Sequence, residues 1–144
     1  MQVYTTNSEE ETIALGRKLT EAVLPGQGLV LLTGNLGAGK TTLVKGIAEG
    51  LGAAARDEVT SPTFTLIHEY GDPARLFHVD LYRLETAREV LGLGIEELLG
   101  RRALVVIEWG DRFVQLWPEE RVEIEIERMA NDQRRFLIRS AKAS

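Results

Sequence analysis

The segment Gly34–Thr41 constrains the fold and chemistry of this 144-residue chain more than any other feature. It reads Gly-Asn-Leu-Gly-Ala-Gly-Lys-Thr and matches the phosphate-loop pattern Gly-x-x-x-x-Gly-Lys-Ser/Thr in full. The apolar run Leu29–Leu32 comes before it, and a helix is expected after it, from about Lys40 to Leu51. The motif requires this order of strand, loop and helix. The segment therefore predicts that the chain binds a nucleoside triphosphate.

The chemistry expected of the loop follows from its residue types. Its glycines permit tight turns, so that backbone N–H groups form an anion nest at the positive end of a helix. We expect the Lys40 ammonium to bind the β and γ phosphates, the Thr41 hydroxyl to bind Mg²⁺, and Thr42 to contact the α phosphate. The predicted nucleotide contacts here are Asn35, Leu36, Gly37, Ala38, Gly39, Lys40, Thr41 and Thr42. The alternative is a glycine-rich turn with an exposed lysine, but the complete motif in this context seldom arises by accident.

A phosphate loop needs an acid at the end of a neighbouring strand to hold Mg²⁺, directly or through water. Glu108 follows the buried-strand run Ala103–Ile107, and Asp80 follows the run Leu76–Val79. Ligands of parallel sheets bind at the carboxyl ends of the strands. Glu108 is therefore the predicted magnesium ligand, and Asp80 a second acid that faces the metal or positions water. With Lys40 they are the predicted catalytic residues, although either acid could instead be a solvated strand end.

The segment Thr60–Thr65 lies between the phosphate-loop helix and the next predicted strand. Its hydroxyls could meet the γ phosphate or Mg²⁺, as in GTPase switch segments. A plain Ser-Pro turn explains the pattern equally well. His68 and His78 have no further metal-type spacing around them, so structural roles are expected for both. Trp109 could shield the site from water, although packing alone would also explain it.

The hydrophobic patterns predict one α/β domain over residues 1–144, with a three-layer phosphate-loop fold. Its mixed sheet is expected to have a parallel core and antiparallel hairpin additions. A capping box of Ser8 and Glu11 is expected to start the first helix. The predicted helices cover residues 8–24, 40–51, 85–91 and 95–99, and the predicted strands cover residues 29–32, 64–70, 75–82, 103–107, 121–127 and 135–139.

Composition narrows the classes of function. The net charge is −5, from 17 basic and 22 acidic residues, whereas an autonomous nucleic-acid binder usually has a basic excess. The chain has no cysteine, which excludes disulfide frameworks and thiolate zinc sites. We recognise no signal peptide at its start and no apolar run long enough to span a membrane. A cytoplasmic location is the expectation.

Several motifs in a fixed order resemble the TsaE family, also called YjeE. They are the phosphate loop, Ser61-Pro62-Thr63-Phe64-Thr65-Leu66, His78-Val79-Asp80-Leu81-Tyr82-Arg83-Leu84, Leu93-Gly94-Ile95-Glu96-Glu97-Leu98-Leu99 and Ile107-Glu108-Trp109. The resemblance covers essentially the whole chain. One departure is Asn35, where many members carry Asp; Asn keeps the shape and loses a charge, so we expect binding to be retained.

The resemblance implies an ATPase whose Mg-ATP binding and hydrolysis support the TsaB–TsaD complex. That complex forms N6-threonylcarbamoyladenosine at tRNA position 37, so tRNA would be met only indirectly, and no membrane is involved. The family match assigns magnesium binding to Thr41 and Glu108 and a role in turnover to Asp80. It also places the base between the N-terminal segment, at Thr6 or Asn7, and the C-terminal hairpin. The predicted base contacts in that hairpin lie within Asn131 to Arg135, with Asn131 and Arg134 preferred.

Three alternatives to the ATPase remain. A small-molecule or protein kinase would need an acceptor pocket and usually a lid with arginines, and the pairs Arg101-Arg102 and Arg134-Arg135 form no obvious lid. A regulatory GTPase would carry an Asn-Lys-x-Asp motif, which this sequence lacks. A scaffold that binds nucleotide without hydrolysis is the third. For the ATPase, Arg83 or a partner protein could supply an arginine finger.

Overall fold

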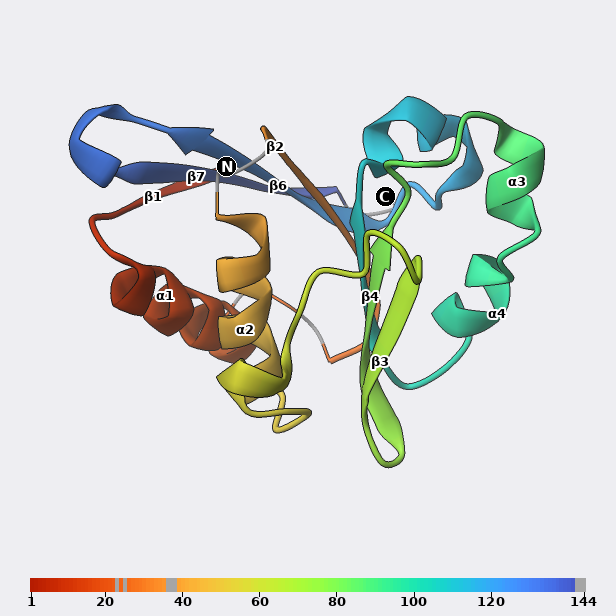
Figure 1. Ribbon diagram of the computed structural model, residues 1–144, viewed down its shortest axis with the longest axis horizontal. Helices are drawn as coiled ribbons and strands as arrows, with labels where there is room; N and C mark the ends of the chain where they lie inside the picture. The colour runs from red at the N-terminus through yellow and green to blue at the C-terminus, as the bar shows by residue number, and fades with distance from the viewer. Residues whose placement is uncertain (23, 25, 36–38, 142–144) are drawn as a thin grey trace.

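The computed structural model describes residues 1–22, 24, 26–35 and 39–141, which are built around one mixed β-sheet (Figure 1). The strands are β1 (Gln2–Thr6), β2 (Gly28–Gly34), β3 (Ile67–Gly71), β4 (Ala74–Asp80), β5 (Leu104–Glu108), β6 (Arg121–Arg128) and β7 (Arg134–Ala141). Their order across the sheet is β1-β7-β6-β2-β5-β4-β3. The central strands β6, β2, β5 and β4 are parallel, and the outer pairs are antiparallel. This confirms the predicted sheet with a parallel core and antiparallel hairpin additions.

Helices cover both faces of the sheet. They are α1 (Glu9–Ala22), α2 (Lys40–Gly50), α3 (Ala87–Leu91) and α4 (Ile95–Leu99), with the 3-10 helices η1 (Arg56–Glu58), η2 (Gly110–Leu116) and η3 (Ala130–Asp132). In Figure 1, α1 and α2 lie on one side of the sheet, and α3 and α4 lie on the other. Successive side chains of a strand point to opposite faces. Val30 and Leu32 of β2 therefore pack with α1 and α2, whereas Leu29 and Leu31 join the core with α3, α4 and η2.

Two glycines let α1 and α2 pack backbone to backbone. A Cβ on Gly46 of α2 would lie 2.1 Å from the Ile13 carbonyl oxygen, and a Cβ on Gly16 of α1 would lie 2.6 Å from the Leu43 carbonyl oxygen. Both distances are far below van der Waals contact, so no side chain fits there. This close contact fixes α2, whose first residue is Lys40, against α1.

The start of α1 carries the cap that the sequence predicts, with one shift. The N–H of Glu11 donates to the Ser8 hydroxyl at 3.1 Å. The Glu11 carboxylate accepts from the N–H of Asn7 at 3.0 Å, one residue before the expected partner. These bonds satisfy N–H groups that the first turn of a helix leaves free. They also fix the segment that joins β1 to α1.

The structure differs from the predicted elements at several places. The strand expected from residue 64 begins at Ile67, because Leu66 has a φ of 71° and its N–H donates to the Pro62 carbonyl at 2.7 Å, which closes a turn. β4 ends at Asp80 instead of residue 82. The strand β1 and the helix η2 were not predicted. No helix in the described residues is both long enough and apolar enough to cross a membrane.

The register of the parallel strands places their carboxyl ends together. Leu32 of β2 lies opposite Glu108 of β5, and Glu108 lies opposite Asp80 of β4. The chain leaves β2 at Gly34 and enters α2 at Lys40 above this edge. The two predicted acids and the start of the phosphate-loop helix therefore meet at one edge of the sheet.

Candidate nucleotide-binding site

A cavity of about 640 Å³ lies at this edge. Its walls come from the start of α1, the start of α2, the segment Thr60–Thr65, the ends of β4 and β5, and the C-terminal hairpin. Lys40, Thr41 and Thr42 line it on one side, and Asp80 and Glu108 line it on another. A cleft with a few convergent polar groups at the carboxyl ends of parallel strands is the usual place for a ligand in such folds.

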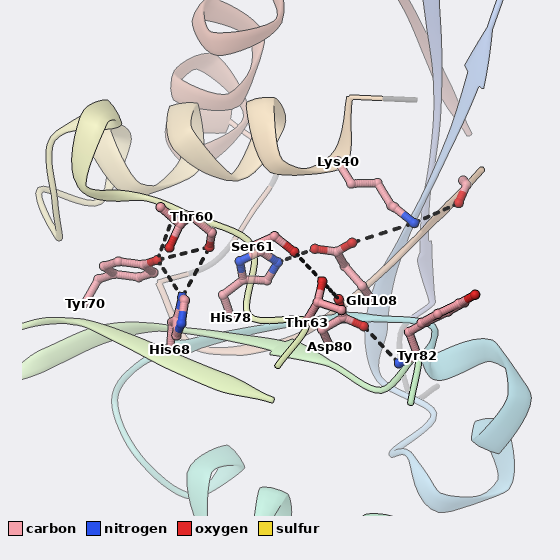
Figure 2. A network of polar contacts seen from close by, with 11 residues as sticks. Lys40, Thr60, Ser61, Thr63, His68, Tyr70, His78, Asp80, Tyr82 and Glu108 are labelled. Carbon is pink, nitrogen blue, oxygen red and sulfur yellow. Dashed lines mark hydrogen bonds and ion pairs between the residues drawn. The ribbon is translucent and has the colours of Figure 1, made fainter. Parts of the chain in front are cut away.

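Lys40 is a buried cation inside this site. Its side chain is only 7% exposed, and Nζ donates to the Gly34 carbonyl oxygen at 2.9 Å. Nζ also lies 3.6 Å from Glu108 Oε1 (Figure 2). The ring centre of Trp109 lies 4.5 Å from Nζ. Lysine is seldom buried unless its charge is paired. The ammonium is therefore held by the loop, the carboxylate and the indole ring, close to where phosphates would meet the α2 N-terminus.

Glu108, the last residue of β5, is buried, and each of its two carboxylate oxygens has a different partner. Oε1 faces the Lys40 ammonium, and Oε2 is hydrogen-bonded to Nε2 of His78 from β4. Sequence reasoning treated His78 only as a structural histidine and missed this contact. The signal was available: His78 stands two residues before Asp80, so both side chains leave the same face of β4. On that face they lie beside Glu108 of the neighbouring strand.

Asp80 connects β4 to the segment Thr60–Thr65. Its Oδ2 accepts from the Thr63 hydroxyl at 3.1 Å, and its Oδ1 accepts from the Tyr82 N–H at 2.9 Å. The Ser61 hydroxyl lies 2.8 Å from the Thr63 hydroxyl, and both residues line the cavity (Figure 2). The structure thus places hydroxyls of this segment opposite Lys40, where a switch segment would stand.

The other end of that segment is fixed by β3. The Thr60 N–H donates to the Tyr70 hydroxyl at 3.3 Å, and His68 Nδ1 lies 3.2 Å from the Thr60 carbonyl oxygen. Phe64, the residue after Thr63, is 83% exposed, and the Arg83 guanidinium lies 5.0 Å from its ring centre. Arg83 therefore contacts the outside of the segment, which leaves its predicted role as an arginine finger a prediction.

The predicted phosphate-loop residues are only partly described. Gly39 has a φ of 106°, a left-handed conformation that suits glycine, and it lines the cavity with Lys40, Thr41 and Thr42. Asn35 borders a neighbouring cavity that shares Lys40 and Trp109 with the first. The predicted contacts Leu36, Gly37 and Ala38 lie outside the described residues.

The predicted base contacts are brought to the far side of the cavity by strand pairing, since Thr6 of β1 lies opposite Arg134 of β7. Asn7 and Arg134 line the cavity. Thr6 is buried instead, with its hydroxyl 2.7 Å from that of Thr12, and neither Thr6 nor Asn131 is among the described lining residues. Both therefore stay predictions. Sequence reasoning missed the lining residues Glu9 and Thr12, which no motif marks.

The oxygen donors of the cavity fit Mg²⁺ together with a nucleotide. Among the described residues, no group of three or more His, Asp or Glu side chains is arranged to hold a metal by itself. Mg²⁺ is usually held by one or two carboxylates, with phosphate and water oxygens completing its coordination. Glu108 and the hydroxyl of Thr41, both at the cavity, offer that kind of donor set. The site suits a metal that arrives with phosphates.

Comparisons with known proteins agree on one family. Residues 6–136 match the profile described as "Threonylcarbamoyl adenosine biosynthesis protein TsaE". The chain is 42% identical over 132 residues to the tRNA threonylcarbamoyladenosine biosynthesis protein TsaE of Bacillus subtilis (strain 168), covering 91% of this chain and 80% of that protein. It is 39% identical over 124 residues to the protein of the same name from Treponema pallidum (strain Nichols), covering 86% and 87%.

A solved structure supports the same relationship. The crystal structure of Bacillus subtilis YdiB matches with a TM-score of 0.76 and 34% sequence identity, covering 98% of this chain and 86% of that chain. The resemblance that the sequence motifs indicated is therefore confirmed. The chain belongs to the TsaE family, which acts in the biosynthesis of threonylcarbamoyladenosine in tRNA.

Proposed function

We propose that this chain binds Mg-ATP in the cavity above the parallel strands and hydrolyses it. The observation that carries the proposal is the position of Lys40. Its side chain is only 7% exposed at the start of α2, and its ammonium lies between the Gly34 carbonyl and Glu108 instead of extending into solvent. Burying a lysine costs free energy unless its charge is paired with a negative group. A site that receives the β and γ phosphates accounts for this burial.

The residues around the cavity divide the work of phosphoryl transfer to water. The Lys40 ammonium and the N–H groups at the start of α2 would stabilise negative charge on the phosphates. Mg²⁺, held by Thr41 and Glu108, would neutralise part of the charge that develops during transfer. Asp80, which is fixed by Thr63 and the Tyr82 N–H, would orient the attacking water. The Trp109 ring, 5.1 Å from that of Tyr82, would limit the access of other water.

ATP is favoured over GTP because the sequence has no Asn-Lys-x-Asp motif for guanine. We propose that the base lies between the N-terminal segment and the C-terminal hairpin, near Asn7 and Arg134. Arg134 is oriented by its own loop, since Nη1 donates to the Asp132 carbonyl oxygen at 2.9 Å. Thr6 is buried, so it would support the base site only through the side chains that line the cavity. Asn131 would contact the base only after the loop between β6 and β7 moved.

The hydrolysis is proposed to support other proteins of the pathway. The TsaB–TsaD complex is the proposed partner, and tRNA would be met only through it. The net charge of −5 supports this arrangement, because an acidic chain is repelled by the phosphates of RNA. A cytoplasmic location is part of the same proposal.

Tryptophan fluorescence tests nucleotide binding directly. Trp109 lies against Lys40 at the cavity, whereas Trp117 is buried in the core with α3 and α4 and donates to the Gly110 carbonyl. Titration with Mg-ATP is expected to change the emission of the wild type and of Trp117→Phe, and to have little effect on Trp109→Phe. GTP binding more tightly than ATP would contradict the proposed nucleotide. Product analysis should give free phosphate, since a phosphorylated acceptor would favour a kinase.

A further inference from the structure

His78 is fully buried in the middle of the sheet, beneath the candidate site. It belongs to β4, which lies between the parallel strand β5 and the antiparallel strand β3, and its Nε2 is hydrogen-bonded to Oε2 of Glu108 (Figure 2). The role proposed above for Glu108 uses only its carboxylate and does not involve His78. Burying an imidazole costs free energy of desolvation, and an apolar side chain would fill the same space without that cost. Packing alone therefore does not explain a histidine at this position.

We propose that His78 is a positioning residue that sets the orientation of the Glu108 carboxylate. Its Nε2–H holds one oxygen of Glu108 at the sheet, which leaves Oε1 to face Lys40 and the magnesium–nucleotide. This role rests on the proposed binding of Mg-ATP and adds a residue to it. Partners behind the direct ligands of a metal commonly fix the orientation of those ligands.

The hydrogen-bonding capacity of the two side chains determines the direction of this bond. An ionised carboxylate only accepts hydrogen bonds, so Nε2 must carry the proton and donate it. Nδ1 is buried and has no hydrogen-bond partner among the described residues. A ring protonated on Nδ1 alone would leave that N–H without a hydrogen-bond partner. It would also place the unprotonated Nε2, an acceptor, against the carboxylate oxygen of Glu108, which is an acceptor too. The contact therefore requires the tautomer with its proton on Nε2.

The distance between Glu108 and Lys40 shows what the restraint achieves. Oε1 lies 3.6 Å from Nζ, longer than a direct hydrogen bond, while Nζ donates to the Gly34 carbonyl at 2.9 Å. A carboxylate released by His78 could rotate and bring both oxygens to the ammonium. The resulting closer ion pair would compete with phosphates for Lys40 and with Mg²⁺ for Glu108. The bond from His78 prevents this closure.

Three substitutions of one residue separate positioning from packing. The side-chain amide nitrogen of His78→Gln falls near the Nε2 position and can still donate to Glu108. His78→Asn is also polar, but its amide ends near the Nδ1 position and cannot reach. His78→Leu is apolar and donates nothing. If His78 acts by holding Glu108, Gln restores function, whereas Asn and Leu do not.

The measurement is the Mg²⁺ concentration that half-saturates the enhancement of ATP binding, followed by fluorescence, with ATP binding in EDTA as the reference. His78→Asn and His78→Leu should raise that concentration by about 10- to 100-fold. His78→Gln should stay within about threefold of the wild type, and affinity in EDTA should change little in all three, within the usual spread of measured contributions. Equal loss in all three variants, or loss confined to the EDTA condition, would overturn the positioning role.

The free protein offers a second readout that depends neither on nucleotide nor on any His78 variant. Nitrogen-15 NMR of histidine-labelled protein should show His78 protonated on Nε2, with a strongly downfield proton that shifts in Glu108→Gln. A proton on Nδ1 alone would overturn the positioning role and leave the proposed ATPase intact. A wild type that binds no Mg-ATP would instead overturn the proposed function, even with the expected tautomer.

Discussion

Lys40 and Glu108 carry opposite charges inside the protein, with side chains 7% and 4% exposed and a separation of 3.6 Å. Removing one member of a buried pair leaves the other uncompensated. Here each member has a further partner: the Gly34 carbonyl for Lys40, and His78 for Glu108. Substitutions of either residue should therefore affect chemistry more clearly than they affect folding.

Lys40→Ala removes the only charge at the start of α2 that reaches the cavity from the described part of the loop. We expect ATP hydrolysis to fall by on the order of 100-fold or more, because a preorganised charge at the transferred phosphate is lost. Steady-state phosphate release measures this, with circular dichroism as the control for folding. Turnover comparable to that of the wild type in a reconstituted modification reaction would contradict the role of Lys40.

Glu108→Ala should separate binding from chemistry. Lys40 and the start of α2 remain to bind phosphates, so nucleotide affinity measured in EDTA should change little. Magnesium-dependent hydrolysis should fall by roughly 10- to 100-fold, because a direct or water-mediated ligand of the metal is lost. Comparison of the ATP dissociation constant with kcat decides the point. Equal losses in affinity and in turnover would count against the proposed assignment.

At the scale of elements, the contact of α1 with α2 places Lys40, because Gly16 and Gly46 allow the two backbones to touch. Gly46→Ala would force a methyl group to within 2.1 Å of the Ile13 carbonyl oxygen. We expect a loss of about 1–3 kcal/mol in the free energy of unfolding, measured by urea denaturation. Gly26→Ala is the matched control, because a Cβ there meets nothing within 4 Å. Similar stability of the two variants would contradict this account of the helix contact.

A charged cluster joins the same two helices to η1. Glu49 of α2 contacts Arg56 of η1 at 2.8 Å and Arg17 of α1 at 2.7 Å. Hydrogen bonds from Arg56 and then from Arg17 lower the pKa of Glu49 from 4.5 to about 2. Because this pKa is lower in the folded state than in the unfolded state, ionised Glu49 stabilises the fold fully above pH 4.5. That contribution is lost as the pH falls from 4.5 towards 2.

Glu49→Gln tests this linkage. Urea unfolding at pH 6 and pH 3 should show a larger loss of stability for the wild type than for the variant, since only the wild type protonates this group. The two curves should converge towards acid pH. A parallel loss in both proteins would mean that the cluster contributes no pH dependence. The ion pair between Glu97 of α4 and Arg101, which follows that helix, is exposed and serves as a comparison with little expected effect.

The elements that the sequence predicted well have strong local signals. Leu29–Leu32 and Ala103–Ile107 are continuous apolar runs, and both became buried parallel strands. β1 was missed because Gln2–Thr6 has little apolar character, and its pairing with β7 depends on residues far along the chain. The turn at Leu66 was missed because a left-handed leucine has no sequence signature. Local patterns therefore predicted the layers, but not the strand order.

The same limit applies to the site. Lys40, Thr41, Asp80 and Glu108 were identified because a motif or a strand end marks each of them, and the structure brings all four to one cavity. The base side carries no motif. Its lining residues Asn7 and Arg134 are brought together by the pairing of the N-terminal and C-terminal strands. Because no local pattern predicts that pairing, only the family resemblance pointed to these two residues. The contact of His78 with Glu108 joins the neighbouring strands β4 and β5. The spacing of His78 and Asp80 places both on one face of β4, but the register of the sheet is needed to place Glu108 beside them.

At the scale of the whole molecule, the N-terminal strand β1 pairs with the C-terminal strand β7, so that Thr6 at the end of β1 lies opposite Arg134 at the start of β7, beside the cavity. The cavity consequently collects residues from nearly every part of the chain, from Asn7 to Arg134. One side of its wall, the segment Thr60–Thr65, presents the exposed Phe64 outwards.

The most direct test of the central claim is ATP turnover by the purified chain, measured with and without the TsaB–TsaD complex. The account predicts slow release of phosphate by the chain alone, strong stimulation by the complex, and no stimulated turnover for Lys40→Ala. Free phosphate should be the product in each case. Turnover that the complex leaves unchanged, or that persists fully in Lys40→Ala, would contradict the claim that this cavity hydrolyses ATP in support of tRNA modification.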